Sequence, residues 1–277
     1  MPSLVLQSPG SIICKIGPVT LRWYGMMFAI AFMTASYFAS KLAKREGIDQ
    51  EKLTNLTLIC FIAGVLGARL YFVALNWTTP GTGFMYRPAE ILATWEGGLS
   101  IHGGIIGGFI AFWLYTNKHK LPKARIADIC TTVLPLGQAI GRWGNFFNSE
   151  AFGVPVPDGF PLAVFIPPHS RPARFQSASL FHATFLYEAI WDFGIFLLLY
   201  CYLNKKLRNY PGACAWVYIA LYNIGRLMIE PLRTDSIMAG EIPVPIIASI
   251  VFLVVSLCLI PYFIYKGKAN AKVSDDK

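Results

Sequence analysis

A run of thirteen residues in the middle of the chain concentrates polar side chains between two apolar segments. It spans 141–153 and reads GRWGNFFNSEAFG, with Arg142 and Asn145 three residues apart. A helix would place these two side chains on one face. A lone arginine near the end of an apolar segment is more often an interfacial residue that reaches water. Here five polar or charged side chains fall within nine positions, which makes a functional site the favoured interpretation.

A second set of polar residues has helical spacing. Tyr222, Arg226 and Glu230 stand at i, i+4 and i+8, so they would lie on one helix face. One interpretation is an Arg226–Glu230 pair that neutralises itself. The other is that Glu230 orients Arg226 toward an anion. The spacing is compatible with both.

A third candidate is His102, which lies in the glycine-rich segment 97–108. A lone histidine is more often a packed core residue than a catalyst, but imidazole is also a common general base. The neighbouring Ser100 lacks the G-x-S-x-G pattern of an activated serine nucleophile. We predict no metal site, because the histidines are dispersed and no HExxH motif occurs.

The elements that carry these residues are apolar enough for a membrane. The 277 residues are 55% hydrophobic and 14% charged, whereas soluble domains average about 25% charged. A membrane span needs about 20 mostly apolar residues, and backbone pairing within the span requires a helix. Seven such runs occur, at roughly 19–41, 53–76, 98–116, 126–146, 183–203, 212–231 and 244–265.

The expected fold is therefore an all-α integral membrane protein with about seven transmembrane helices. No linker, repeat or low-complexity run divides the sequence, so we expect a single polytopic domain over residues 1–277. No signal peptide is evident at the start. The six cysteines are scattered without a CxxC pair, which favours a role as small apolar residues.

The net charge of +9 follows from a strong asymmetry between connections. Fifteen of the 24 Lys and Arg lie in alternate connections: 41, 44, 45, 52, 118, 120, 123, 125, 205, 206, 208, 266, 268, 272 and 277. The other connections and the first twenty residues hold five. Basic loops stay in the cytoplasm, so we expect an outside N-terminus, a cytoplasmic C-terminus and an extracytoplasmic loop near 147–182. The charge is a topology signal, and no nucleic-acid partner is expected.

This topology puts several polar residues at one depth. Four arginines fall inside the predicted spans, and each needs a partner or a purpose there. These arginines are Arg22, Arg69, Arg142 and Arg226. Together with His102, Tyr187 and Glu188, they would lie in the outer half of the bilayer. A transporter for a small anion is the rival interpretation, but many transporters bind at the midplane between repeated halves. An intramembrane protease would lack its nucleophile motif.

The run at 141–153 also resembles, in full, the signature G-R-x-G-N-F-x-N-x-E-x-x-G of the prolipoprotein diacylglyceryl transferases. The resemblance extends to segments 22–25, 97–104, 222–230 and 233–235 in matching order, and so covers most of the chain. One departure is Ala183, where the family commonly has proline after the histidine. That change removes no functional group.

The resemblance implies a reaction at the outer face of the bacterial cytoplasmic (inner) membrane. The family transfers the sn-1,2-diacylglyceryl group of phosphatidylglycerol to the lipobox cysteine thiol in the signal peptide of a prolipoprotein. A thioether forms and glycerol 1-phosphate is released. The expected partners are these two substrates and the lipid bilayer, and no cofactor is expected.

This chemistry gives the candidate residues roles. Cations that hold a phosphate more tightly as its second charge develops lower the barrier, and Arg142 and Arg226 suit this role. His102 is the best candidate for the base that takes the thiol proton, with Tyr24 or Glu150 as alternatives. The catalytic candidates are therefore His102, Arg142, Arg226 and Tyr24. The candidates for binding phosphatidylglycerol are Arg142, Asn145, Glu150, Gly153, Tyr222, Arg226 and Glu230.

Overall fold

The computed structural model describes residues 4–17, 19–79, 83–94, 97–240 and 242–275. Trp95 and Glu96, which precede the glycine-rich segment, lie outside the described residues. The chain divides into two compact units. The large unit comprises Met1–Ala39 and Ala127–Lys277, and the small unit comprises Ser40–Ile126.

The small unit is built on two long antiparallel helices, α2 (Gln50–Leu75) and α3 (Ile101–Lys118). Asp49 caps α2, accepting hydrogen bonds from the backbone N–H groups of Glu51 and Lys52 at 2.9 and 3.3 Å. The connection contains two short 3₁₀ turns, η1 (Phe84–Tyr86) and η2 (Pro88–Glu90). Glycines let α2 and α3 pack with their backbones in contact: a Cβ on Gly67 or Gly103 would collide with the opposite helix.

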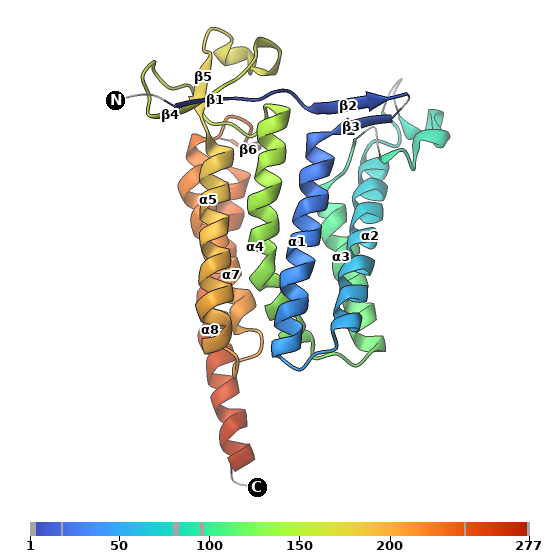
Figure 1. Cartoon of the computed structure of the whole chain (residues 1–277), viewed down its shortest axis with the longest axis vertical. Coiled ribbons are helices and arrows are strands. Elements are labelled where there is room, and N and C mark those ends of the chain that lie inside the picture. Colours follow the sequence, from blue (N-terminus) through green and yellow to red (C-terminus); the bar gives the residue numbers. More distant parts are fainter. Residues whose placement is uncertain (1–3, 18, 80–82, 95–96, 241, 276–277) are drawn as a thin grey trace. The chain divides into compact units, whose positions relative to one another are not determined.

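The large unit contains the other long helices (Figure 1). These are α1 (Trp23–Arg45), α4 (Lys123–Asn148), α5 (Thr184–Leu197), α7 (Ala213–Ile229) and α8 (Val244–Asp275), of which α1 and α4 continue into the small unit. α5 runs on through a π-helical turn, η6 (Leu198–Leu203), into α6 (Asn204–Lys206).

A buried carboxylate on α4 fixes the start of α7. Asp128 is fully buried and accepts the backbone N–H groups of Gly212 and Ala215 at 2.7 and 2.9 Å. The first N–H groups of a helix have no partner within it, so this carboxylate serves as a cap supplied from another helix. Gly212 has φ +97°, a conformation that favours glycine.

Short strands lie at one end of the large unit (Figure 1). β1 (Leu4–Gln7) pairs in parallel with β4 (Leu162–Phe165), and β4 pairs antiparallel with β5 (Leu180–His182). β2 (Ile12–Ile16) and β3 (Val19–Arg22) form a hairpin. A third pair joins β6 (Met238–Ala239) to β7 (Ile242–Pro243).

These strands correct the all-α expectation, although the protein is mostly helical. β4 and β5 pack around a small apolar core that includes Phe152, Ile166 and Phe181. The strands are two to five residues long and form only by pairing with distant segments. They therefore leave little local periodicity in the sequence.

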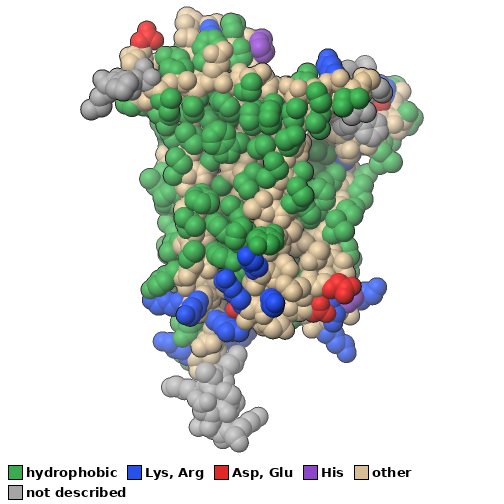
Figure 2. Space-filling view, viewed as in Figure 1, with side chains coloured by type: hydrophobic (Ala, Val, Ile, Leu, Met, Phe, Trp, Pro, Cys, Tyr) green, Lys and Arg blue, Asp and Glu red, His purple; other side chains and the backbone are tan. Residues whose placement is uncertain are grey.

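The helical part has the apolar surface of a membrane protein. Within the described residues, four helices are long and apolar enough to cross a membrane: Trp23–Arg45, Gln50–Leu75, Thr184–Lys206 and Val244–Ala269. Figure 2 shows a mostly hydrophobic surface along the helices, with most of the lysines and arginines in view gathered at its lower end. The first helix begins at Trp23, not near residue 19 as predicted, because Val19–Arg22 pairs with β2.

Candidate active site

The best-defined polar site in the large unit is centred on Glu188, which lies just over one turn into α5. Its side chain is 4% exposed and contacts three arginines from different parts of the chain. Arg142 of α4 forms an ion pair with Oε2, while Arg226 of α7 and Arg233 donate to Oε1 at 3.2 and 2.8 Å. We call Glu188 with these three arginines the arginine cluster.

Two further carboxylates hold the arginine cluster in place. Glu230, only 1% exposed, accepts a hydrogen bond from Arg226 and another from the Ser236 hydroxyl at 2.7 Å. The Arg226–Glu230 pair predicted from spacing is therefore present. Asp235 accepts two hydrogen bonds from the Arg233 guanidinium, at 2.7 and 3.0 Å.

The charge on Arg233 is secured by its surroundings. Burial lowers the pKa of the Arg233 guanidinium, but the hydrogen bonds and negative charges of Asp235 and Glu188 outweigh burial and raise this pKa above its ordinary value. The cluster thus holds three guanidinium groups that are 11–19% exposed. Such an array can bind a phosphate through several charge-assisted hydrogen bonds.

The end of α4 presents a second polar group. The Glu150 carboxylate accepts hydrogen bonds from the Asn145 and Asn148 side-chain amides at 2.9 and 3.4 Å. Ser149 and Ala151, on either side of Glu150, both have φ +54°, which is uncommon for residues with a side chain. Such backbone persists where neighbours hold it, and here the Thr184 hydroxyl donates to the Ala151 carbonyl at 2.7 Å.

Gly153 joins this turn to the arginine cluster through the backbone. Its N–H donates to the His182 carbonyl at 2.9 Å, and it forms a β-bridge with Arg233. A Cβ at Gly153 would collide with the His182 and Thr184 side chains and the Leu232 carbonyl. Close backbone packing is thus sufficient reason for glycine here, and its predicted role in lipid binding stays a prediction.

Two tyrosines from the predicted set lie within electrostatic range of the arginines. The Tyr24 ring packs against Gly144, where a side chain would collide with it, and Tyr24 interacts electrostatically with Glu150 and Arg142. Tyr222 interacts in the same way with Arg226 and Arg142. The large unit therefore brings Tyr24, Asn145, Glu150 and Tyr222 to the region of Arg142 and Arg226.

His102 belongs to the small unit. It is the second residue of α3, exposed, with its ring 6.2 Å from the Tyr71 ring centroid. Because its imidazole is exposed, His102 is not a packed core residue, which was the alternative interpretation of a lone histidine. Its predicted role as a base stays a prediction.

Arg69 and Arg22 have structural explanations. The Arg69 guanidinium is buried and donates to four backbone carbonyls, those of Glu90, Ile91, Gly97 and Gly98, while lying over the Phe84 ring at 5.1 Å. Arg69 thus links the segment before α3 to α2, and its N–H groups donate to backbone carbonyls. Arg22 lies in β3 and is exposed, so placing it inside a span was wrong.

Two residues of the arginine cluster, Glu188 and Arg233, were not among the site residues predicted from the sequence. Glu188 was named among the residues expected in the outer half of the bilayer, and Arg233 within the resemblance, but neither received a role. A buried carboxylate needs cations beside it. An acidic residue at the same predicted depth as several arginines was therefore the signal that could have assigned Glu188 to the site. Asp192, one turn further along α5, is 2% exposed, and its Oδ2 has no hydrogen-bond partner among the described residues.

Comparisons with known proteins identify the family of the chain. A family model described as "Prolipoprotein diacylglyceryl transferase" matches residues 11–262. The chain is similar to phosphatidylglycerol–prolipoprotein diacylglyceryl transferases from three bacteria. The Trichormus variabilis enzyme is 39% identical, covering 92% of this chain and 90% of the relative. The Synechococcus elongatus enzyme is 41% identical, covering 90% of this chain and 86% of the relative. The Thermotoga maritima enzyme is 44% identical, covering 83% of this chain and 76% of the relative.

Proposed function

The chain belongs to the prolipoprotein diacylglyceryl transferase family and is a transferase, and we propose that its arginine cluster binds the phosphate of phosphatidylglycerol during the transfer. The observation that carries this proposal is the contact of one buried carboxylate, Glu188, with Arg142, Arg226 and Arg233. A lipid phosphate entering this cluster meets guanidinium groups that carboxylates already hold in place. Preorganised donors of this kind need little rearrangement during reaction.

In the proposed reaction, the cysteine sulfur of the prolipoprotein attacks the sn-3 carbon of the diacylglyceryl group. The carbon–sulfur bond forms as the carbon–oxygen bond to phosphate breaks, and glycerol 1-phosphate leaves with the bonding electrons. The phosphate changes from one negative charge toward two. Arg142 and Arg226 therefore bind the transition state more strongly than the intact lipid, which is the condition for lowering the barrier.

The thiol proton needs an acceptor, because a free cysteine has a pKa of about 8.5. We assign this role to His102, an exposed imidazole at the start of α3, with Tyr24 or Glu150 as alternatives. Asn145 and Glu150 would align the headgroup, with Gly153 beside them in the turn. Tyr222 and Glu230 would support Arg226.

We further propose the membrane arrangement that the basic residues predict. The chain would cross the bacterial inner membrane seven times, using α1, α2, α3, α4, α5 with its continuation, α7 and α8. The N-terminus and the loop near 147–182 would face outward, and the C-terminus would be cytoplasmic. The lipobox peptide and the lipid would then both be drawn from the bilayer at its outer leaflet.

Arginine-to-lysine substitutions test the role of the cluster. Arg226→Lys and Arg142→Lys keep a positive charge but lose the planar fork that binds phosphate oxygens. Each should lose about 2–4 kcal/mol of transition-state stabilisation, the usual cost of removing one donor to a developing charge. The assay uses purified protein, phosphatidylglycerol and a lipobox peptide, with the diacylglyceryl adduct quantified by mass spectrometry.

Arg87→Lys is the matched control, because Arg87 lies in the small unit and pairs with Glu90 at the surface. It should leave transfer unchanged. Full turnover by Arg226→Lys would reduce Arg226 to a structural counter-ion of Glu230.

A further inference from the structure

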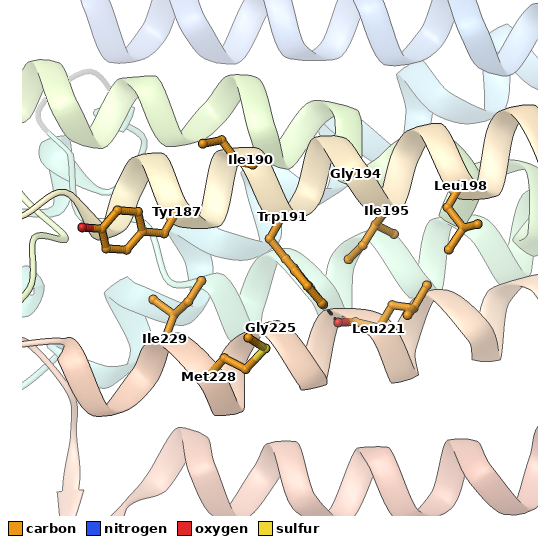
Figure 3. A pocket seen from close by; sticks show the side chains of 10 residues that line it. All are labelled: Tyr187, Ile190, Trp191, Gly194, Ile195, Leu198, Leu221, Gly225, Met228 and Ile229. Carbon is orange, nitrogen blue, oxygen red and sulfur yellow. Dashed lines mark hydrogen bonds between the residues drawn. The ribbon is translucent and has the colours of Figure 1, made fainter. Parts of the chain in front are cut away.

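A hydrophobic groove runs between α5 and α7, with a volume of about 390 Å³. Its lining residues come from both helices, and Figure 3 shows Tyr187 and Ile195 on α5, and Leu198 where η6 begins, across from Leu221, Met228 and Ile229 on α7. This volume lies in the range of about 300–1,000 Å³ that is typical of ligand sites. Ile190 and Met228 are both more than 60% exposed, so the groove opens along the surface of the helices.

One end of the groove adjoins the arginine cluster. Tyr187 precedes Glu188 on α5, while Gly225 precedes Arg226 on α7 and Ile229, the last residue of α7, precedes Glu230. A molecule with an anionic head at the arginines would thus have the apolar groove directly beside that head.

The length of the groove matches one leaflet of a bilayer. From Tyr187 on α5 to Leu198, where η6 continues the helix, the groove follows eleven residue steps, or about 16 Å at 1.5 Å per residue. Half of a hydrocarbon core of about 30 Å is about 15 Å. A chain that begins at the arginines and fills the groove would end near the middle of the membrane, where acyl chains of one leaflet end.

The groove offers an acyl chain few polar contacts. The Trp191 N–H, which would otherwise face the apolar space, donates to the Leu221 carbonyl at 3.0 Å (Figure 3). The indole packs against Gly225, where any Cβ would collide with it. At Gly194, in contrast, an added Cβ would meet no atom within 4 Å, so this glycine leaves the groove open.

We propose that this groove binds one acyl chain of the phosphatidylglycerol whose phosphate lies at the arginine cluster. The proposal rests on the proposed function and adds a second contact for the same substrate. The occupant is a lipid chain and not a protein partner, because the length equals that of one leaflet and the anionic head would lie at the arginines. Binding energy from the chain would help to hold the glyceryl carbon in position for attack.

Gly194→Leu tests the groove, since the new side chain enters open space. Transfer from dioleoyl and dioctanoyl phosphatidylglycerol to a lipobox peptide is measured for both proteins. For the long-chain lipid, kcat/KM should fall by at least about tenfold in the variant, the discrimination a filled hydrophobic pocket usually gives. For the short-chain lipid, which reaches less far, the change should be within about twofold. Gly194→Ala should give a smaller loss in the same direction.

Leu197→Phe is the control, since Leu197 is exposed on α5 and does not line the groove. It should leave both lipids unaffected. If Gly194→Leu changes neither lipid, or slows both equally while its melting temperature is unchanged, the acyl-chain assignment is wrong. Absence of transfer by the wild-type protein with either lipid would instead refute the proposed function.

A photoreactive lipid gives a second readout that does not depend on turnover. Phosphatidylglycerol with a diazirine at the end of one acyl chain should label Leu198 or Leu221, at the far end of the groove. Gly194→Leu should remove this labelling. Adducts found only on other helices, or none in the groove because a second copy of the chain covers it, would overturn the proposal.

Discussion

Glu188 sets the charge balance of the arginine cluster. Its carboxylate is the shared counter-ion of Arg142, Arg226 and Arg233, and it is almost fully buried. Without this negative charge the three guanidinium groups would repel one another in a region of low dielectric constant. Glu188 therefore both permits the arginines to be close and decides where they point. An arriving phosphate competes with Glu188 for the same donors.

Glu188→Gln should expose this dual role. Glutamine keeps the shape but removes the charge, and breaking a buried ion pair from one side typically costs about 3–5 kcal/mol of stability. We expect a lower melting temperature in detergent and a loss of transfer activity. Added phosphatidylglycerol should raise the melting temperature more in the variant than in the wild type, since its phosphate replaces the missing charge.

Glu188→Asp is the matched control for that experiment. Aspartate keeps the negative charge but has a shorter side chain, so the melting temperature of this variant should lie between those of the wild type and Glu188→Gln. An unchanged melting temperature in Glu188→Gln would show that the arginines do not depend on this carboxylate.

The sequence predicted part of the site at the level of single residues. The Arg226–Glu230 pair was predictable because helix geometry brings i and i+4 together without any tertiary information. The contacts of Arg142 and Arg233 with Glu188 were not, because they depend on how α4, α5 and the segment after α7 pack. Arg69 shows the converse: its depth suggested a site, whereas its donors are used by four backbone carbonyls.

Among the elements, α2 and α3 depend on glycine for their contact. A Cβ on Gly103 would collide with the Gly67 carbonyl and the Tyr71 side chain, and one on Gly107 would collide with the Ala63 carbonyl. Gly104 differs, since a Cβ there would meet its nearest atoms at 3.6 and 3.7 Å, an ordinary contact. Of these two adjacent glycines, Gly103 is required by the close packing of the helices and Gly104 is not. Close backbone approach at small residues is a general device of membrane helices.

Substitution of these neighbours by alanine separates the two cases. Gly103→Ala should force α2 and α3 apart and cost about 1–3 kcal/mol, the usual penalty of overpacking. Gly104→Ala should be neutral or stabilising by up to about 1 kcal/mol, because alanine favours a helix over glycine. Thermal unfolding in detergent measures both. Equal melting temperatures for the two variants would contradict the packing that the structure shows.

The elements themselves were predictable in proportion to their length. Each of the seven predicted apolar runs overlaps a long helix, because a sustained apolar composition is a local property of the sequence. The first boundary was misplaced because Val19–Arg22 is apolar enough to extend a helix but pairs with Ile12–Ile16. The parallel pairing of β1 with β4 joins segments more than 150 residues apart, and no local pattern marks it.

For the whole molecule, the distribution of basic residues is the feature that predicts orientation. Fifteen Lys and Arg lie in alternate connections and at the C-terminal end, against five in the others. The reason is that segments rich in Lys and Arg stay on the cytoplasmic side when the chain inserts into the membrane. The orientation decides from which leaflet the enzyme can take its lipid, so the proposed outer-leaflet site depends on it.

Cysteine labelling in cells tests this orientation directly. Asp158, Gly240 and Lys120 are exposed, so cysteines at these positions are open to a reagent that can reach their side of the membrane. After the six native cysteines have been replaced, Asp158→Cys and Gly240→Cys should react with a membrane-impermeant maleimide in cells stripped of any outer membrane. Lys120→Cys should react only after the cells are permeabilised, because its loop lies between Lys118 and Lys123 in a basic connection.

Labelling of Lys120→Cys in intact cells, with the other two protected, would reverse the orientation. The cluster at Glu188 would then face the cytoplasmic leaflet, and a prolipoprotein thiol presented at the outer surface could not reach it.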